Sequence, residues 1–180
     1  MAMSDAKVQF AQLAVQYYAA GRYAAISHLI PVLGSLLHHA VEMALKASLS
    51  DSKTLPQLKE LGHDLRKIWA QFKLLHPSAA TAPFDTVVTG LQKFEELRYP
   101  DSVLERGAAM EFVLFKEHVG TTRNSTPSVP RYALVLEEID KLETFIFRTA
   151  DINPLFFTGA MSKEAKRYLM QENREASSWK

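Results

Sequence analysis

The chain has 180 residues, of which 47% are apolar and 23% charged, and this suits one globular domain with a substantial core. The absence of cysteine excludes disulfides and thiolate metal sites, and no apolar run approaches the ~18 residues of a membrane span. A net charge of +1 gives no overall attraction for phosphate backbones. Because the amino terminus lacks the features of a secretory signal, we expect a cytoplasmic protein with no membrane contact.

The first 50 residues predict two helices. Ser4 is placed to cap the first helix, and Gly21 is placed to end it. The second helix starts at Pro31, or is kinked there, and continues to Leu49. Its apolar positions follow the i, i+3, i+4 spacing of one buried face: Ile26, Leu29, Ile30, Leu33, Leu36, Leu37, Ala40, Val41, Ala44 and Leu45.

The next 50 residues predict two further helices. Pro56 opens the third segment, which keeps helical spacing to Leu75, and Gly62 is a possible break that would delay the regular helix to near His63. A proline-flanked linker at 77–83 leads into a fourth helix, which ends before Pro100 because a residue preceding proline disfavours the helical region.

The second half of the chain is less regular. Residues 101–129 are expected to be an irregular insertion, in which EFVLFK at 111–116 suits either a short strand or a helical turn. Pro130 opens a last long helix, and Ser162 is placed to cap a short basic helix within a C-terminal extension at 155–180, whose final residues we expect to fray. The fold class predicted is all-α, an up-and-down bundle of about five main helices in a single domain at 1–180 with its core at 5–150.

Three short pieces place polar residues among strongly apolar helices. They are HHAVEMALKASL at 38–49, GHDL at 62–65 and LRYP at 97–100. In this order, and with the helices between them, the three pieces resemble the HEPN domain (higher eukaryotes and prokaryotes nucleotide-binding). The resemblance covers residues 5–100, with the helix from Pro130 as the closing element.

The resemblance implies a helical bundle, frequently dimeric, of the kind found in proteins that handle nucleotides or RNA. Many HEPN domains are metal-independent ribonucleases that use an arginine followed four to six residues later by a histidine, near the start of a late helix. Here Arg22 and His28 alone have this spacing, and they precede the second helix. Arg22 and His28 are therefore weak catalytic candidates, and no catalytic site is predicted.

A second group of residues forms the candidate ligand-binding site or structural polar network. Glu42 is four residues from both His38 and Lys46, so the three share one helix face, where ion pairs stabilise by only ~0.2–0.5 kcal/mol. A carboxylate in a helix interface needs a charged partner, and Arg98 offers a bidentate one. The group comprises His39, Glu42, Lys46, His63, Asp64, Arg98 and Tyr99.

Metal and cofactor sites are not predicted. His38 or His39 can reach one ion together with Glu42, and His63 or Asp64 would complete the set. However, the chain contains no HExxH motif, and neighbouring imidazoles and carboxylates are common on helices.

The function predicted is a non-catalytic binding or interaction module, whose ligand is a nucleotide or RNA. The alternatives are an active HEPN-type ribonuclease and a purely structural partner of another protein. Homodimerisation is also expected, because three aromatic residues fall off the main helical stripes and aromatic residues are enriched at interfaces: Tyr18, Tyr23 and Phe147.

Overall fold

The computed structural model describes residues 3–94, 97, 100–119 and 129–179, which form eight α-helices and one two-stranded sheet. The prediction of a mostly helical fold is confirmed, and one small two-stranded sheet accompanies the helices. Among the described residues, no helix combines the length and apolar composition that crossing a membrane requires. The helices are α1 (Asp5–Ile26), α2 (Ile30–Leu49), α3 (Leu55–Glu60), α4 (Leu65–Leu75), α5 (Asp85–Phe94), α6 (Pro100–Arg106), α7 (Leu136–Thr149) and α8 (Lys163–Met170).

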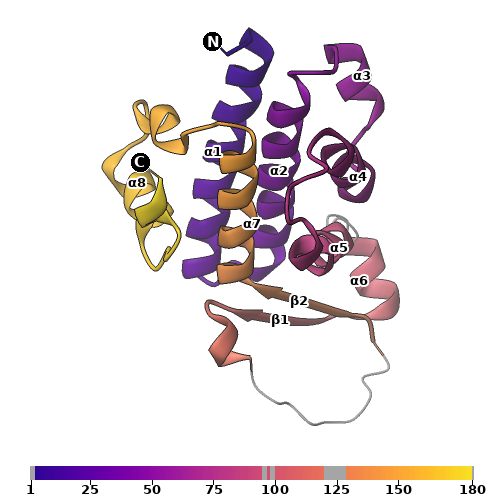
Figure 1. Ribbon diagram of the computed structural model, residues 1–180. Helices are drawn as coiled ribbons and strands as arrows, with labels where there is room; N and C mark the ends of the chain where they lie inside the picture. The colour runs from indigo at the N-terminus through magenta and orange to yellow at the C-terminus, as the bar shows by residue number, and fades with distance from the viewer. Residues whose placement is uncertain (1–2, 95–96, 98–99, 120–128, 180) are drawn as a thin grey trace.

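Helix α2 is the centre of the molecule. It begins at Ile30 with Pro31 in its first turn, close to the predicted start, and it contacts α1, α4, α5 and α7 (Figure 1). Its predicted stripe from Leu33 to Leu45 is buried, apart from a partly exposed Leu36. Because α2 is covered on several sides, its polar side chains are drawn into helix interfaces as well.

Helix α1 extends further than predicted. Ser4 caps it by accepting a hydrogen bond from the amide of Lys7, as expected, but the helix continues past Gly21 to Ile26. A Cβ at Gly21 would lie 2.7 Å from Cδ2 of Leu37, so the glycine permits close packing of α1 on α2 and does not end the helix.

The predicted interruption at Gly62 is confirmed. Gly62 has a φ of +63°, and the turn that contains it separates α3 from α4. Asp64 caps α4 by accepting hydrogen bonds from the amides of Arg66 and Lys67. The turn therefore places His63 between two helices, beside the middle of α2.

The helix predicted to open at Pro130 begins six residues later. Residues Arg131–Val135 form strand β2, which pairs in parallel with β1 (Ala109–Val113), and α7 follows directly. Tyr132 and Leu134 are buried while the residues between and before them are exposed, the alternation of a half-buried strand. The sheet lies across the end of the helices, beside α5 (Figure 1).

The region expected to be irregular is partly ordered into regular structure. Within 101–129, α6 ends at Arg106 and β1 follows, so the strand interpretation of Glu111–Lys116 holds for residues 111–113. Residues 120–128 lie outside the described part of the chain. Helix α5 ends at Phe94, and the predicted end of this helix at Arg98-Tyr99 lies outside the described residues.

The C-terminal segment packs on α1 and α7. Ser162 caps α8 as predicted, although the helix ends at Met170 and not near Arg174. The expectation of frayed final residues is wrong for Trp179, which is buried and donates a hydrogen bond from its indole nitrogen to Oγ1 of Thr144. Phe156, in contrast, is 81% exposed.

Candidate functional site

A buried polar cluster forms around Glu42 where α2 meets the turn between α3 and α4. The Glu42 side chain has no exposed surface, and Nζ of Lys46 donates to its Oε1 at 2.7 Å. Nδ1 of His63 lies 3.0 Å from both carboxylate oxygens, and Nδ1 of His39 lies 3.2 Å from Oε2. Four of the predicted residues, from two of the sequence motifs, therefore meet at one carboxylate.

Backbone contacts hold the turn that carries His63 in place. Lys46 also donates to the carbonyl oxygen of Gly62 at 2.8 Å. Nε2 of His38 lies 3.0 Å from the carbonyl oxygen of His63, so the fully buried imidazole of His38 anchors this backbone. The His63 ring itself remains 61% exposed. The cluster is therefore closed on the side of α2 and open to solvent at His63.

The carboxylate of Glu42 is charged. Burial alone would raise its pKa, but hydrogen bonds from His39, Lys46 and His63 outweigh burial and lower the pKa from 4.5 to about 2. The helix face that carries Glu42 is therefore not a solvated one. An isolated charge here would cost several kcal/mol, and the three partners compensate that cost.

Of the remaining predicted members, Asp64 is described by the structure and does not join the cluster. The Asp64 carboxylate caps α4, and it also makes a long 3.6 Å ion pair with Nε of Arg66. Arg98 and Tyr99 lie outside the described residues. The proposed pairing of Arg98 with Glu42 or Asp64 thus remains a prediction, and Lys46 is the charged partner that the structure shows.

A second buried network uses Arg22, the weak catalytic candidate. Its guanidinium has no exposed surface and pairs with both carboxylate oxygens of Asp140 on α7. The remaining donors contact the carbonyl oxygens of Tyr168, at 3.1 Å, and Gln171. His28 is exposed in the turn between α1 and α2, with a φ of +56°. Each of the three guanidinium nitrogens of Arg22 therefore has a partner inside the fold.

The second network continues through Tyr18. Its hydroxyl donates to Asp140 and accepts a hydrogen bond from the side-chain amide of Asn173 at 3.1 Å. Burial raises the pKa of Tyr18 well above its ordinary value, so the hydroxyl remains a donor at neutral pH. Sequence analysis missed Asp140 and Asn173, because both lie more than 100 residues from their partners and next to ordinary apolar stripes.

Glu143 is a buried carboxyl group of a different kind. It has no exposed surface, and neither of its oxygens has a hydrogen-bond partner among the described residues. Burial, together with the nearby charge of Asp140, raises the pKa of Glu143 well above 4.5. Glu143 therefore keeps its proton to a higher pH than an ordinary glutamate does, whereas Glu42 loses its proton at a lower pH.

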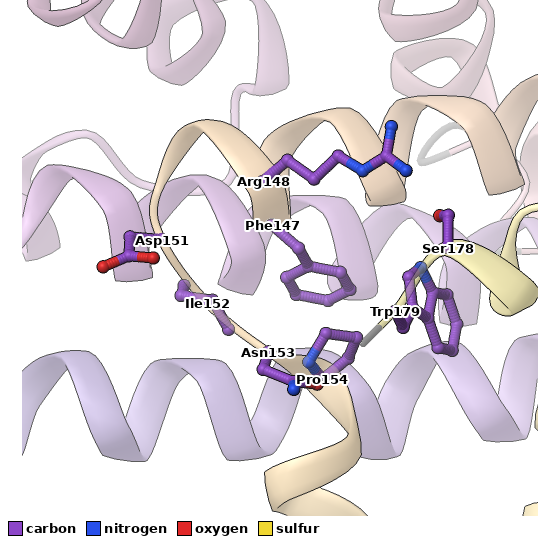
Figure 2. A pocket seen from close by; sticks show the side chains of 8 residues that line it. All are labelled: Phe147, Arg148, Asp151, Ile152, Asn153, Pro154, Ser178 and Trp179. Carbon is purple, nitrogen blue, oxygen red and sulfur yellow. The ribbon is translucent and has the colours of Figure 1, made fainter.

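Two concave features lie away from the Glu42 cluster. A cavity of about 210 Å³ at the end of α7 is lined by Phe147, Pro154 and Trp179, which face one another, while Asp151 points away from them (Figure 2). Its volume is below the ~300–1,000 Å³ usual for small-molecule sites. An apolar groove of about 340 Å³ lies between α1 and α8 and is lined by Gln16, Ala19, Ala20, Tyr23, Met161, Glu164, Ala165 and Tyr168.

The aromatic residues that suggested dimerisation have different environments. Tyr18 and Phe147 are buried within the chain, so they do not contribute to an outer interface. Tyr23 is 45% exposed at the apolar groove. There its ring packs edge-on against the ring of Tyr168, with the two ring centroids 4.8 Å apart. Of the three aromatics, Tyr23 alone can contact a partner.

Comparison of the chain with protein-family models, curated proteins and solved structures finds no match. Chemically, the Glu42 cluster combines a charged carboxylate, an ammonium group and two imidazoles, one of them largely exposed. Such a set can stabilise a helix interface, contact an anion through His63, or bind a metal ion through its imidazoles.

Proposed function

We propose that the chain is a HEPN-like helical bundle that acts as a non-catalytic binding or interaction module, with a nucleotide or RNA as its ligand. The resemblance to HEPN domains rests on motifs at 38–49 and 62–65, and the convergence of Glu42, Lys46 and His63 from these motifs supports reading them as one unit. The third motif falls largely outside the described residues.

The burial of Arg22 is the observation that carries the non-catalytic part of the proposal. A HEPN-type ribonuclease needs a cation beside the scissile phosphate and an imidazole for proton transfer. Arg22 has no exposed surface, and Asp140 and two backbone carbonyls occupy its donors. RNA cannot approach this guanidinium without disruption of the contacts between α1 and α7. His28 therefore lacks the arginine that a ribonuclease site of this type requires.

The turn between α3 and α4 is the surface to which we assign the anionic ligand. Between residues 59 and 67 the chain carries Lys59, Arg66 and Lys67, all exposed, beside the exposed ring of His63. Two carboxylates lie in the same stretch, Glu60 and Asp64, and Asp64 is engaged as a helix cap. The excess of cations suits contacts to phosphate oxygens, which position a nucleic acid without reading its sequence.

Binding measurements test this assignment. We would follow the fluorescence anisotropy of labelled single-stranded RNA, and the heat of binding of ATP and GTP, in buffer with excess chelator. We expect salt-dependent RNA binding, and Lys67→Glu should weaken it and lower the slope of log affinity against log salt by about one. The control Lys166→Glu lies on α8, on the other side of the α1–α2 pair, and should have no effect (Figure 1).

The absence of binding to all three ligands would overturn the nucleotide or RNA proposal. The alternative function, a structural partner of another protein, would then be favoured. It has a specific observation in its support, the apolar groove beside Tyr23, since exposed apolar concavities of this kind are typical of protein contacts.

A further inference from the structure

The two imidazoles at Glu42 are arranged as metal ligands would be. The sequence alone does not predict a metal site, since the chain lacks the spaced motifs of metal proteins. In the structure, His39, Glu42 and His63 each offer one ligand atom, and these three atoms all lie within 4.8 Å of one another. Two of the residues come from α2 and the third from the turn before α4, so the sequence spacing gives little indication of the set.

The distances fit one small ion. Two ligands bound tetrahedrally at about 2.1 Å from an ion lie roughly 3.4 Å apart. Oε2 of Glu42 lies 3.2 Å from Nδ1 of His39 and 3.0 Å from Nδ1 of His63. Both distances are close to this value, so rotations of the two rings would bring the three atoms around one ion.

The surrounding contacts support the ligands from a second layer. Lys46 donates to Oε1 of Glu42 and so leaves Oε2 directed at the two imidazoles. Lys46 also binds the carbonyl of Gly62, and His38 lies at the carbonyl of His63, so the backbone that carries one ligand is fixed from two sides. Such outer partners orient metal ligands in known sites.

The protonation of the imidazoles is compatible with metal binding. Within the described part of the chain, the hydrogen bonds of His39 and His63 to other side chains involve Nδ1 and leave Nε2 without a hydrogen-bond partner. To bind an ion, each ring would move the proton with which Nδ1 donates to Glu42 to Nε2, and would present the lone pair of Nδ1 to the ion.

We propose that His39 Nδ1, Glu42 Oε2 and His63 Nδ1 bind one divalent transition-metal ion of the zinc class. Two imidazoles and one carboxylate suit Zn²⁺, Co²⁺ or Ni²⁺, whereas Mg²⁺ and Ca²⁺ prefer oxygen ligands. Three protein ligands leave a fourth position open, and the 61% exposure of the His63 side chain directs that position to solvent. The proposal does not rest on the proposed function.

Titration of the chelator-treated 180-residue chain with Zn²⁺ and Co²⁺ tests the site. We expect calorimetry to give one Zn²⁺ per chain, Co²⁺ to give the visible absorption of a tetrahedral complex, and Zn²⁺ to raise the melting temperature. His39→Ala and His63→Ala should each weaken Zn²⁺ binding by roughly 100-fold, since loss of an outer partner alone costs 10–100-fold. The matched control is His118→Ala, at an exposed histidine outside the cluster, and it should bind as the wild type does.

Two results would overturn the proposal. One is the absence of Zn²⁺ and Co²⁺ binding by the wild type, in which case hydrogen bonds alone account for the cluster. The other is binding that survives in both His39→Ala and His63→Ala. Because His63 is largely exposed, His63→Ala is expected to fold, and its melting temperature without metal checks this. The RNA and nucleotide measurements are made in chelator, so either proposal can fail independently.

Discussion

Glu42 has no exposed surface and yet is charged, and in this it differs from a glutamate on a solvated helix face. Its replacement leaves Lys46 buried without its carboxylate partner. A buried charge deprived of its partner typically costs 3–5 kcal/mol. The residues of this cluster therefore contribute to folding whatever ligand the protein binds.

We predict that Glu42→Ala lowers the free energy of unfolding by roughly 3 kcal/mol, measured by urea unfolding at pH 7. Glu60→Ala is the matched control, because Glu60 is an exposed helical glutamate, and it should change the free energy by less than ~0.5 kcal/mol. Similarly small changes in the free energy of unfolding for both variants would show that Glu42 is not a buried, paired carboxylate.

The stability that Glu143 contributes should depend on pH in the opposite direction to that of Glu42, because its pKa is raised and not lowered. Its pKa in the folded protein is raised by burial and by Asp140, so the folded state keeps a proton that the unfolded state loses above pH 4.5. Folding stability from this group is complete below pH 4.5 and is lost as pH rises toward the folded-state pKa, by at most about 1.4 kcal/mol per pH unit.

We predict that Glu143→Leu is more stable than the wild type at pH 7.5, and that its advantage grows as pH is raised from about 5. Urea unfolding at several pH values measures the difference. Glu60→Leu should give a difference that does not change with pH. A constant difference for Glu143→Leu as well would show that the carboxyl group is solvated or paired in solution.

At the scale of helices, close packing on α2 depends on glycine. A Cβ at Gly34 would lie 2.1 Å from Cδ1 of Phe94, so α5 can pack on α2 only where a side chain is missing. Gly159 has helical backbone angles and open space around the position of a Cβ, and it offers a matched comparison.

We predict that Gly34→Ala destabilises the protein by about 1–3 kcal/mol through overpacking, as measured by urea unfolding. Gly159→Ala should be neutral or stabilising by up to ~1 kcal/mol, because it restricts the unfolded chain and meets no contact. If Gly34→Ala were as stable as the wild type, α5 would not pack on α2 as described.

Elements with strong local signals could be predicted from the sequence. The stripe of α2 repeats over five turns, and the helix start near Pro31 and the break at Gly62 follow from backbone chemistry. Strand β2 could not be predicted, because Tyr132, Val135 and Leu136 fit helical spacing and the partner strand β1 lies about 20 residues earlier. Pairing with a strand that is distant in the sequence determines whether such a segment forms a strand or a helix.

The candidate site was predictable in part for the same reason. Glu42 and Lys46 share a helix face at i, i+4, and the motif order indicated His63 as their neighbour. The Arg22–Asp140 pair joins residues 118 apart in sequence, and nothing local to Arg22 distinguishes a buried arginine from a catalytic one. Its assignment required the packing of α7 and α8 on α1.

At the scale of the whole molecule, the HEPN resemblance and the exposed Tyr23 predict a homodimer. Sedimentation at micromolar concentration should give about twice the 20.3 kDa chain mass. Tyr23→Glu places a charge at the apolar groove and should give a monomer, whereas Leu74→Glu, at a leucine that is 73% exposed on α4, should remain dimeric. A wild type that stays monomeric at high concentration would contradict the expectation.

We propose that this helical bundle does not cleave RNA, because Arg22, its one arginine with HEPN spacing, pairs with Asp140 inside the fold. The most direct measurement incubates the wild type and His28→Ala with structured and single-stranded RNA in excess chelator, which a metal-independent ribonuclease tolerates. We predict intact RNA in both reactions. Cleavage by the wild type that disappears in His28→Ala would contradict the account and establish the ribonuclease alternative.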